Sequence, residues 1–211
     1  MKNFNKVLVS AAVLAVSGAV FAATAPNLNP STTPGAGAYV GINGGYGKIN
    51  ESMKVNAEGK ALGFKTKNDN TGFGGGIDAG YQFTQNIAAE AGVYMMPQAT
   101  YKLTLDGLTV GKPKVTNNFI YAAAKGILPF SNGFNLFGKL GIAGVQQTGN
   151  HAAKTLMDGF KNRTGAAVLL GLGAGYNITK QVSVNVQALG TSKSGKIPAN
   201  LIGTVGVAYH F

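Results

Sequence analysis

Apolar and polar residues alternate with a period of two in several segments of the chain, which predicts β-strands. The clearest case is residues 181–189 (QVSVNVQAL), where Val182, Val184 and Val186 share one face and Gln187 lies on the other. A helix would mix these two sets, because its side chains repeat every 3.6 residues. Tilted strands of about ten residues are long enough to cross a lipid bilayer.

The same alternation predicts eight antiparallel strands. The connections between them are alternately short and long, which is typical of a transmembrane barrel with short periplasmic turns, long outer loops and both chain ends in the periplasm. Because proline cannot donate to a strand ladder, Pro97, Pro113, Pro129 and Pro198 are expected between strands. The strands are predicted near residues 39–47, 73–83, 86–95, 118–128, 134–145, 166–178, 181–191 and 201–211.

Aromatic residues indicate which face of these strands meets lipid. Alternation alone also fits a soluble barrel or sandwich. Aromatic side chains on the apolar face, however, gather beside the short turns, as in an interfacial girdle, and the other face is rich in glycine, alanine and polar residues. The predicted fold is therefore an all-β, eight-stranded, antiparallel up-and-down transmembrane β-barrel over residues 37–211. The inner girdle comprises Tyr81, Phe83, Phe134, Tyr176, Tyr209 and Phe211, and a thinner outer girdle comprises Tyr46 and Phe73.

Four charged residues fall within the predicted strands, namely Asp78, Glu90, Lys125 and Lys139. By parity all four point into the barrel, and they come from four consecutive strands. Because an isolated charge inside a narrow barrel is costly, we expect them to form an internal salt-bridge network. A polar plug or narrow ion path is the functional alternative, although an eight-stranded barrel is only wide enough for its side chains to fill.

The N-terminus has the features of a secretory signal peptide over residues 1–22. Lys2 and Lys6 precede a short apolar stretch that ends in small residues, and cleavage is expected after Ala22, with Ala25 as the alternative. An uncleaved anchor helix is disfavoured, because the stretch is short for a membrane span. Residues 23–36 are rich in Pro, Asn, Ser and Thr, which predicts a flexible periplasmic leader.

Positive charge is concentrated in the predicted outer loops. Thirteen of the Lys and Arg residues fall there against five carboxylates, a net charge of about +8. Such a surface attracts anionic partners such as lipopolysaccharide phosphates, host glycosaminoglycans or acidic proteins, although it is equally the composition of a solvated loop surface. Besides Lys48, the basic residues are Lys54, Lys60, Lys65, Lys67, Lys102, Lys112, Lys114, Lys154, Lys161, Arg163, Lys193 and Lys196.

Catalytic, cofactor and metal chemistry have little support in the sequence. The glycine-rich strings at residues 72–76 and 171–175 lack the spacing of a nucleotide-binding loop, and close packing of small residues explains them better. The chain has no cysteine and two histidines, His151 and His210. A lipid A-modifying site at the outer rim would need His151 with Asp158 or Thr155. We expect no catalytic residues, no cofactor and no metal.

Three stretches carry a family resemblance. The chain ends in LIGTVGVAYHF, which resembles the C-terminal β-signal read by the outer-membrane assembly machinery, here Phe211, Tyr209, Val207 and Val205. GGGIDAGYQFTQNIAAEAGVY and GLGAGYNITKQVSVNVQAL resemble strand pairs of the OmpA-type transmembrane domain and the opacity-protein and porin-like barrel family. OmpA itself continues into a peptidoglycan-binding domain, whereas this chain ends with its eighth predicted strand, so no such tether is expected.

The sequence thus predicts an exported protein of the Gram-negative outer membrane. Its expected role is structural or adhesin-like surface interaction through basic extracellular loops. A narrow porin-like channel for small solutes and a rim-sited lipid A-modifying enzyme are the alternatives. The expected partners are outer-membrane lipid, lipopolysaccharide, the assembly machinery and an anionic surface ligand, with no nucleic acid, and a monomer is expected.

Overall fold

The computed structural model describes residues 34–50, 64–105, 108–111, 114–130, 133–149 and 162–211. The predicted signal peptide, most of the predicted leader, and Lys54, Lys60, Lys112, Lys154 and Lys161 lie outside these residues. No helix long and apolar enough to cross a membrane occurs in the described part of the chain. The strands are β1 (Gly37–Ile49), β2 (Phe64–Asp69), β3 (Thr71–Gln82), β4 (Ile87–Leu105), β5 (Leu108–Gly111), β6 (Lys114–Pro129), β7 (Phe134–Gly149), β8 (Arg163–Asn177), β9 (Val182–Thr191) and β10 (Asn200–His210).

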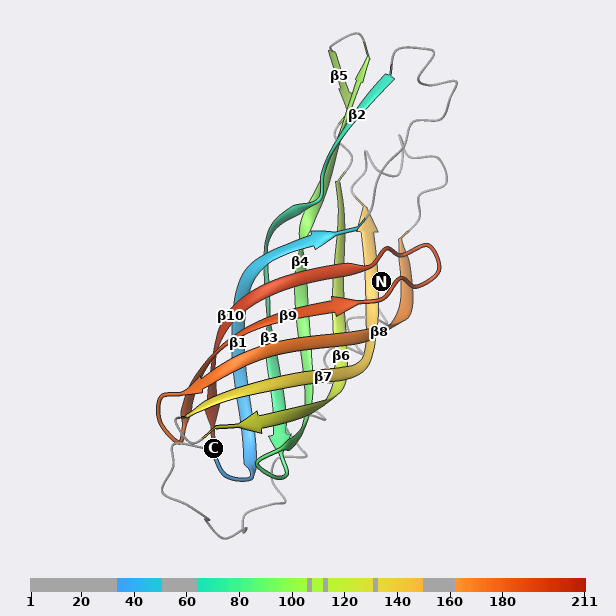
Figure 1. Cartoon of the computed structure of the whole chain (residues 1–211). Helices are drawn as coiled ribbons and strands as arrows, with labels where there is room; N and C mark the ends of the chain where they lie inside the picture. Colours follow the sequence, from blue (N-terminus) through green and yellow to red (C-terminus); the bar gives the residue numbers. More distant parts are fainter. Residues whose placement is uncertain (1–33, 51–63, 106–107, 112–113, 131–132, 150–161) are drawn as a thin grey trace.

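Eight of these strands close into an antiparallel barrel (Figure 1). Neighbours in the chain pair in turn from β3 through β4 and β6 to β10, and β1 closes the ring by pairing with both β3 and β10. A closed ring leaves no unpaired strand edge along the barrel wall, which a lipid environment requires. The predicted fold class is confirmed.

The outward face of the barrel is apolar, as the alternation predicts. Ile142 and Leu172 are 70% and 74% exposed, whereas the inward neighbours Ala143 and Gly171 are buried. Five of the six aromatics predicted for the inner girdle are exposed near the short turns, whereas Tyr81 is half-buried, and Tyr46 and Phe73 are exposed at the outer end. In a membrane these side chains meet lipid, so their exposure costs nothing there.

Two of the short turns are built in the same way. In the turn after β3, the Thr84 hydroxyl accepts hydrogen bonds from the backbone N–H groups of Asn86 (3.2 Å) and Ile87 (3.1 Å). In the turn after β8, the Thr179 hydroxyl accepts from those of Gln181 (3.1 Å) and Val182 (2.9 Å). These turns lie at the end of the barrel where the chain terminates (Figure 1). Each threonine satisfies N–H groups that the ladder leaves free.

The structure corrects the prediction at the outer end of the barrel. Pro97 lies inside β4, at an irregularity where the pairing of β4 with β6 shifts register, and Pro129 is the last residue of β6. A bulge tolerates proline because it interrupts the ladder. β4 continues to Leu105, where it pairs with β2 and β5, two strands in segments predicted to be loops. These strands project beyond the barrel (Figure 1).

The outer half of the lumen contains a large apolar cluster, which differs from the predicted glycine, alanine and polar lining, although the buried polar residues Asn117, Asn200 and Thr191 lie beside it and are hydrogen-bonded to one another. Fully buried aliphatic and aromatic side chains from several strands meet there and form one cluster. In each strand the parity of these residues places them on the inner face. That they lie at the same height in the lumen follows only from the pairing of the strands. The largest of them are Tyr94, Phe119, Ile49, Leu169, Leu189, Ile202, Val115 and Val145.

The connection between β9 and β10 folds over this apolar cluster. The backbone groups of Ser194 and Ile197 exchange hydrogen bonds of 3.0 and 2.9 Å, and Gly195 between them has a φ of 56°, which glycine adopts without strain. Ile197 is buried in the cluster, whereas Lys193 and Lys196 are exposed. This small hairpin covers part of the outer mouth.

Candidate functional site

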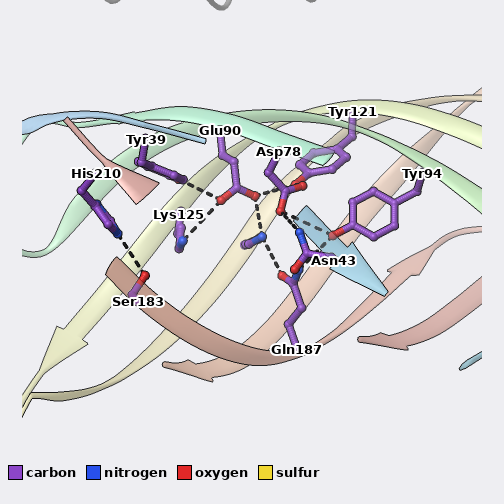
Figure 2. A network of polar contacts seen from close by, with 11 residues as sticks. Tyr39, Asn43, Asp78, Glu90, Tyr94, Tyr121, Lys125, Ser183, Gln187 and His210 are labelled. Carbon is purple, nitrogen blue, oxygen red and sulfur yellow. Dashed lines mark hydrogen bonds and ion pairs between the residues drawn. The ribbon is translucent and has the colours of Figure 1, made fainter. Parts of the chain in front are cut away.

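The four charged residues predicted for the interior lie on β3, β4, β6 and β7 and face the lumen. Figure 2 shows Asp78, Glu90 and Lys125 among their partners. Asp78, Glu90 and Lys139 are buried, and Lys125 is partly buried. Two carboxylates and two ammonium groups give the cluster no formal net charge. They occupy the periplasmic half of the lumen, below the apolar cluster.

Glu90 is the centre of this polar network. Its carboxylate forms an ion pair with Lys125 at 3.3 Å and a second ion pair with Lys139. Tyr39 donates a hydrogen bond of 2.8 Å to the same carboxylate, and the Tyr121 hydroxyl lies 2.5 Å from it. Buried charges are tolerated only when they are paired and hydrogen-bonded, and Glu90 has both kinds of partner.

Asp78 forms no ion pair with the residues that the structure describes and is held by neutral donors instead. The Asn43 amide donates a hydrogen bond of 2.6 Å to Oδ2, and the Tyr121 hydroxyl lies 2.8 Å from Oδ1. The Tyr94 hydroxyl lies 3.4 Å from Oδ2. Tyr121 therefore sits between the two carboxylates and connects them.

Gln187 of β9 joins the network from the opposite wall. Its amide oxygen accepts a hydrogen bond of 2.7 Å from Lys139, and its amide nitrogen lies 3.0 Å from Asn43 Oδ1 and 2.9 Å from the Tyr94 hydroxyl. Polar contacts thus cross the lumen from β9 to β1, β4 and β7 (Figure 2). A layer with these contacts fills the barrel and leaves little room for solute at this level.

Aromatic rings surround the two ammonium groups. Lys125 Nζ lies 4.9 Å from the Tyr39 ring centre and 4.6 Å from that of Phe137, and Lys139 Nζ lies 5.4 Å from the latter. At these distances the rings form cation–π interactions with the ammonium groups. These interactions replace part of the hydration that each ammonium group loses on burial.

Inward glycines make room for these large side chains. A Cβ at Gly92 would lie 2.6 Å from Asp78 Oδ1 and 2.7 Å from the Tyr121 ring. A Cβ at Gly173, in the string at residues 171–175, would lie 2.3 Å from the Phe137 ring. The glycine in this string therefore allows close packing of side chains inside the barrel.

The periplasmic mouth holds a small polar cavity of about 50 Å³. Lys125, Ser183 and His210 line it, and the Ser183 hydroxyl lies 3.0 Å from His210 Nε2. The Tyr39 ring packs against the His210 ring at a centroid distance of 5.4 Å. His210 is thus part of the packed inner wall.

Several basic residues predicted in loops lie in strands, because the strands extend past the membrane boundary that the alternation indicates. Lys65 and Lys67 are in β2 and Lys102 is in β4. Likewise Lys48, Lys114 and Arg163 lie at the outer ends of β1, β6 and β8, and Lys193 and Lys196 lie on the β9–β10 hairpin. His151, Thr155 and Asp158 lie outside the described residues.

The four residues compared with an assembly signal lie on or directly after β10. Val205, Val207, Tyr209 and Phe211 are all outward and are 64%, 48%, 47% and 75% exposed. They form one continuous apolar file toward the periplasmic end, and the Phe211 N–H donates a hydrogen bond of 2.9 Å to the Ala38 carbonyl.

The family model described as outer membrane protein beta-barrel domain matches residues 9–211. The chain belongs to this family. Its lumen network, girdles and closed strand order are therefore those of an outer membrane β-barrel protein of a Gram-negative cell. An uncharacterized protein of Coxiella burnetii is 28% identical, over 86% of this chain and 88% of the relative.

Solved outer membrane barrels share the fold. The outer membrane protein OprG from Pseudomonas aeruginosa aligns with a TM-score of 0.56 at 13% identity, covering 86% of this chain and 99% of OprG. Neisserial surface protein A aligns with a TM-score of 0.54 at 14% identity, covering 84% and 99% of the two chains. At such identities the likeness concerns the barrel and not a shared ligand.

Proposed function

We propose that this outer membrane barrel acts at the cell surface, where its basic outer segments bind an anionic partner. The observation that carries the proposal is the sheet that projects from the barrel. β4 pairs with β3 as far as Met95 and then continues, pairing with β2 from Thr100 to Leu105. A long extension held by pairing on both sides offers a surface well above the membrane (Figure 1).

The register of this sheet concentrates positive charge. Lys67 pairs directly with Lys102, and Lys65 pairs with Thr104 two positions further along. Lysines opposite each other in an antiparallel pair destabilise the pairing. An anionic group bound beside them relieves that repulsion, so the arrangement favours sulfated, phosphorylated or carboxylated partners.

Heparin serves as a sulfated probe of this surface. The purified full-length protein in detergent is applied to immobilised heparin and eluted with salt, beside a triple variant with Lys65→Gln, Lys67→Gln and Lys102→Gln. Because screened surface charges bind more weakly at high ionic strength, the triple variant should elute at clearly lower salt. Lys180→Gln, in a periplasmic turn, is the matched control and should elute with the wild type. Elution of the triple variant with the wild type would contradict the proposal.

The narrow-channel alternative has less support, because buried side chains occupy the lumen at two levels. We expect no steady single-channel conductance in planar bilayers. Conductance steps that change in Lys139→Ala would favour the channel instead.

We also propose that the chain is exported with cleavage after Ala22 and that the following leader stays in the periplasm. The intact mass of the protein recovered from outer membranes distinguishes cleavage after Ala22 from cleavage after Ala25.

A further inference from the structure

An open groove of about 740 Å³ crosses the lipid-facing surface between β1 and β8. Its floor lies at Gly203 and Ala188, which are paired neighbours on β10 and β9. Tyr46, paired with Gly203, forms one wall, and Leu172, paired with Ala188, forms the other. Both walls stand out from the barrel, at 56% and 74% exposure. Large residues thus flank two small ones in a single row across four strands.

A cation lies beyond the Tyr46 wall of this groove, outside the residues that line it. Lys48 follows Tyr46 by two residues on β1, so the two exposed side chains share the outward face and Lys48 lies about 7 Å further along the strand toward its outer end. Tyr46 packs edge-on against Phe73 at 5.6 Å, and its hydroxyl lies 3.1 Å from Thr71 Oγ1. This aromatic pair belongs to the outer girdle, at the level of lipid headgroups.

Lys48 has no carboxylate partner among the residues that the structure describes, where both ion pairs belong to Glu90. A lysine directly beyond an aromatic girdle faces the phosphates of the outer leaflet. The groove below it faces hydrocarbon, so acyl chains and not water fill it. An apolar groove with a cation beyond one wall, on the headgroup side, fits the chemistry of a phosphorylated lipid.

We propose that this groove and Lys48 bind one molecule of lipopolysaccharide through its lipid A part. One acyl chain lies over Gly203 and Ala188 between the walls of Tyr46 and Leu172, and a lipid A phosphate lies against the Lys48 ammonium. The site is separate from the projecting sheet of the proposed surface function and shares no residue with it.

Gly203 provides a test that leaves the barrel intact. A Cβ at this position would meet only the Tyr46 carbonyl oxygen, at 3.9 Å, so a larger side chain fits the wall and fills the groove. Gly126, on the outward face of β6, has nothing within 4 Å of such a Cβ and lines a neighbouring lipid-facing groove of about 630 Å³ on the other side of Leu172, so Gly126→Leu tests whether filling any such groove has the same effect. Gly203→Leu and Gly126→Leu are therefore matched variants.

Native mass spectrometry of the full-length protein in mild detergent measures the lipid that each variant retains. Bisphosphorylated lipid A is added to wild type, Gly203→Leu, Lys48→Gln and the controls Gly126→Leu and Lys180→Gln. Wild type and both controls should retain one lipid A, Gly203→Leu should retain none, and Lys48→Gln should bind about fivefold more weakly, as for one lysine near an anionic lipid. Monophosphorylated lipid A should reduce the effect of Lys48→Gln.

Several outcomes would overturn the proposal. These are equal retention by Gly203→Leu and wild type, equal retention of phosphatidylethanolamine and lipid A, and a protein dimer in place of a lipid complex. Folding of every variant is checked by its mobility shift on an unboiled gel. Should Gly203→Leu fail that check, Ala188→Leu fills the same floor and takes its place, and Lys48→Gln tests the phosphate contact by itself.

Discussion

The periplasmic half of the lumen is filled by charged and hydrogen-bonded side chains, whereas the outer half is filled mainly by aliphatic and aromatic ones, beside a smaller neutral polar set at Asn117, Asn200 and Thr191. In the periplasmic half, Glu90 and Asp78 each depend on named donors at hydrogen-bond distance. In the outer half, residues such as Leu169 and Phe119 depend only on volume and contact. The narrow lumen is therefore filled in two different ways, by a polar network in one half and mainly by apolar packing in the other.

This difference determines how each half responds to change. A network of paired charges is sensitive to the identity of each atom, because removal of one partner leaves the other buried and unpaired. An apolar layer is sensitive to size and tolerates substitutions that conserve volume. The predictions below test this contrast, from the largest expected effect to the smallest.

Deleting Phe211 should have the largest effect, because neither half of the lumen forms unless the barrel assembles. Phe211 ends the apolar file of β10, and its N–H bonds to Ala38 of the strand region that closes the ring. We expect a severalfold loss of the protein from the outer membrane, measured by fractionation and surface proteolysis. Unchanged surface levels would show that this residue is no part of an assembly signal.

Glu90→Ala should be the most damaging substitution inside the assembled barrel. It removes the ion-pair partner that Lys125 and Lys139 share and leaves both ammonium groups inside the lumen without a salt bridge, which costs about 3–5 kcal/mol. Urea unfolding in lipid vesicles, followed by the gel mobility shift, measures the loss.

A mutant cycle with Lys139→Ala distinguishes pairing from packing. In a true network the double variant Glu90→Ala with Lys139→Ala is less destabilised than the sum of the singles, by about 0.5–3 kcal/mol. Additive effects would mean that these residues act independently.

Leu169→Ala tests the apolar half and should cost about 2–5 kcal/mol, through lost burial and the cavity it leaves. The neighbour Leu170 is 60% exposed to lipid and provides a control on the same strand. Leu170→Ala should have a much smaller effect in the same unfolding measurement, because lipid fills the space. Equal losses would mean that the outer lumen is not a packed core.

Ile197→Val should have the smallest effect, about 0.5–1.5 kcal/mol, because it removes one methylene from the hairpin side chain that covers the apolar half. The same unfolding assay measures it. Trypsin cleavage at the exposed Lys193 or Lys196 should become faster if Ile197 anchors the hairpin, and an unchanged rate would separate the hairpin from the core.

Much of the barrel could be predicted from the sequence because period-two alternation is a property of each strand alone. Parity was enough to assign Asp78, Glu90, Lys125 and Lys139 to the inner face, where the structure places them. Their neutral partners were missed, although Tyr121 shares the parity of Lys125 on the same strand and could have been included.

The division of the lumen into two layers could not be predicted in the same way. Whether Leu189 and Phe119 lie at one level depends on strand register and tilt, which arise only from pairing between strands. The projecting sheet was missed for a different reason. Pro97 ends the simple alternation of β4, and the short β2 and β5 are defined by their pairing with its extension.

The hydrogen bond between Asn43 and Gln187 joins residues 144 positions apart, so it forms only when the two ends of the chain meet. A slip of one residue between β1 and β10 would turn Asn43 toward lipid and leave Asp78 without its amide donor. A barrel closed in the wrong register is therefore destabilised in two ways. The Asn43 amide is exposed to hydrocarbon, and the Asp78 carboxylate loses a hydrogen-bond donor. The polar layer thus favours one register of pairing between the closing strands and disfavours the registers one residue away.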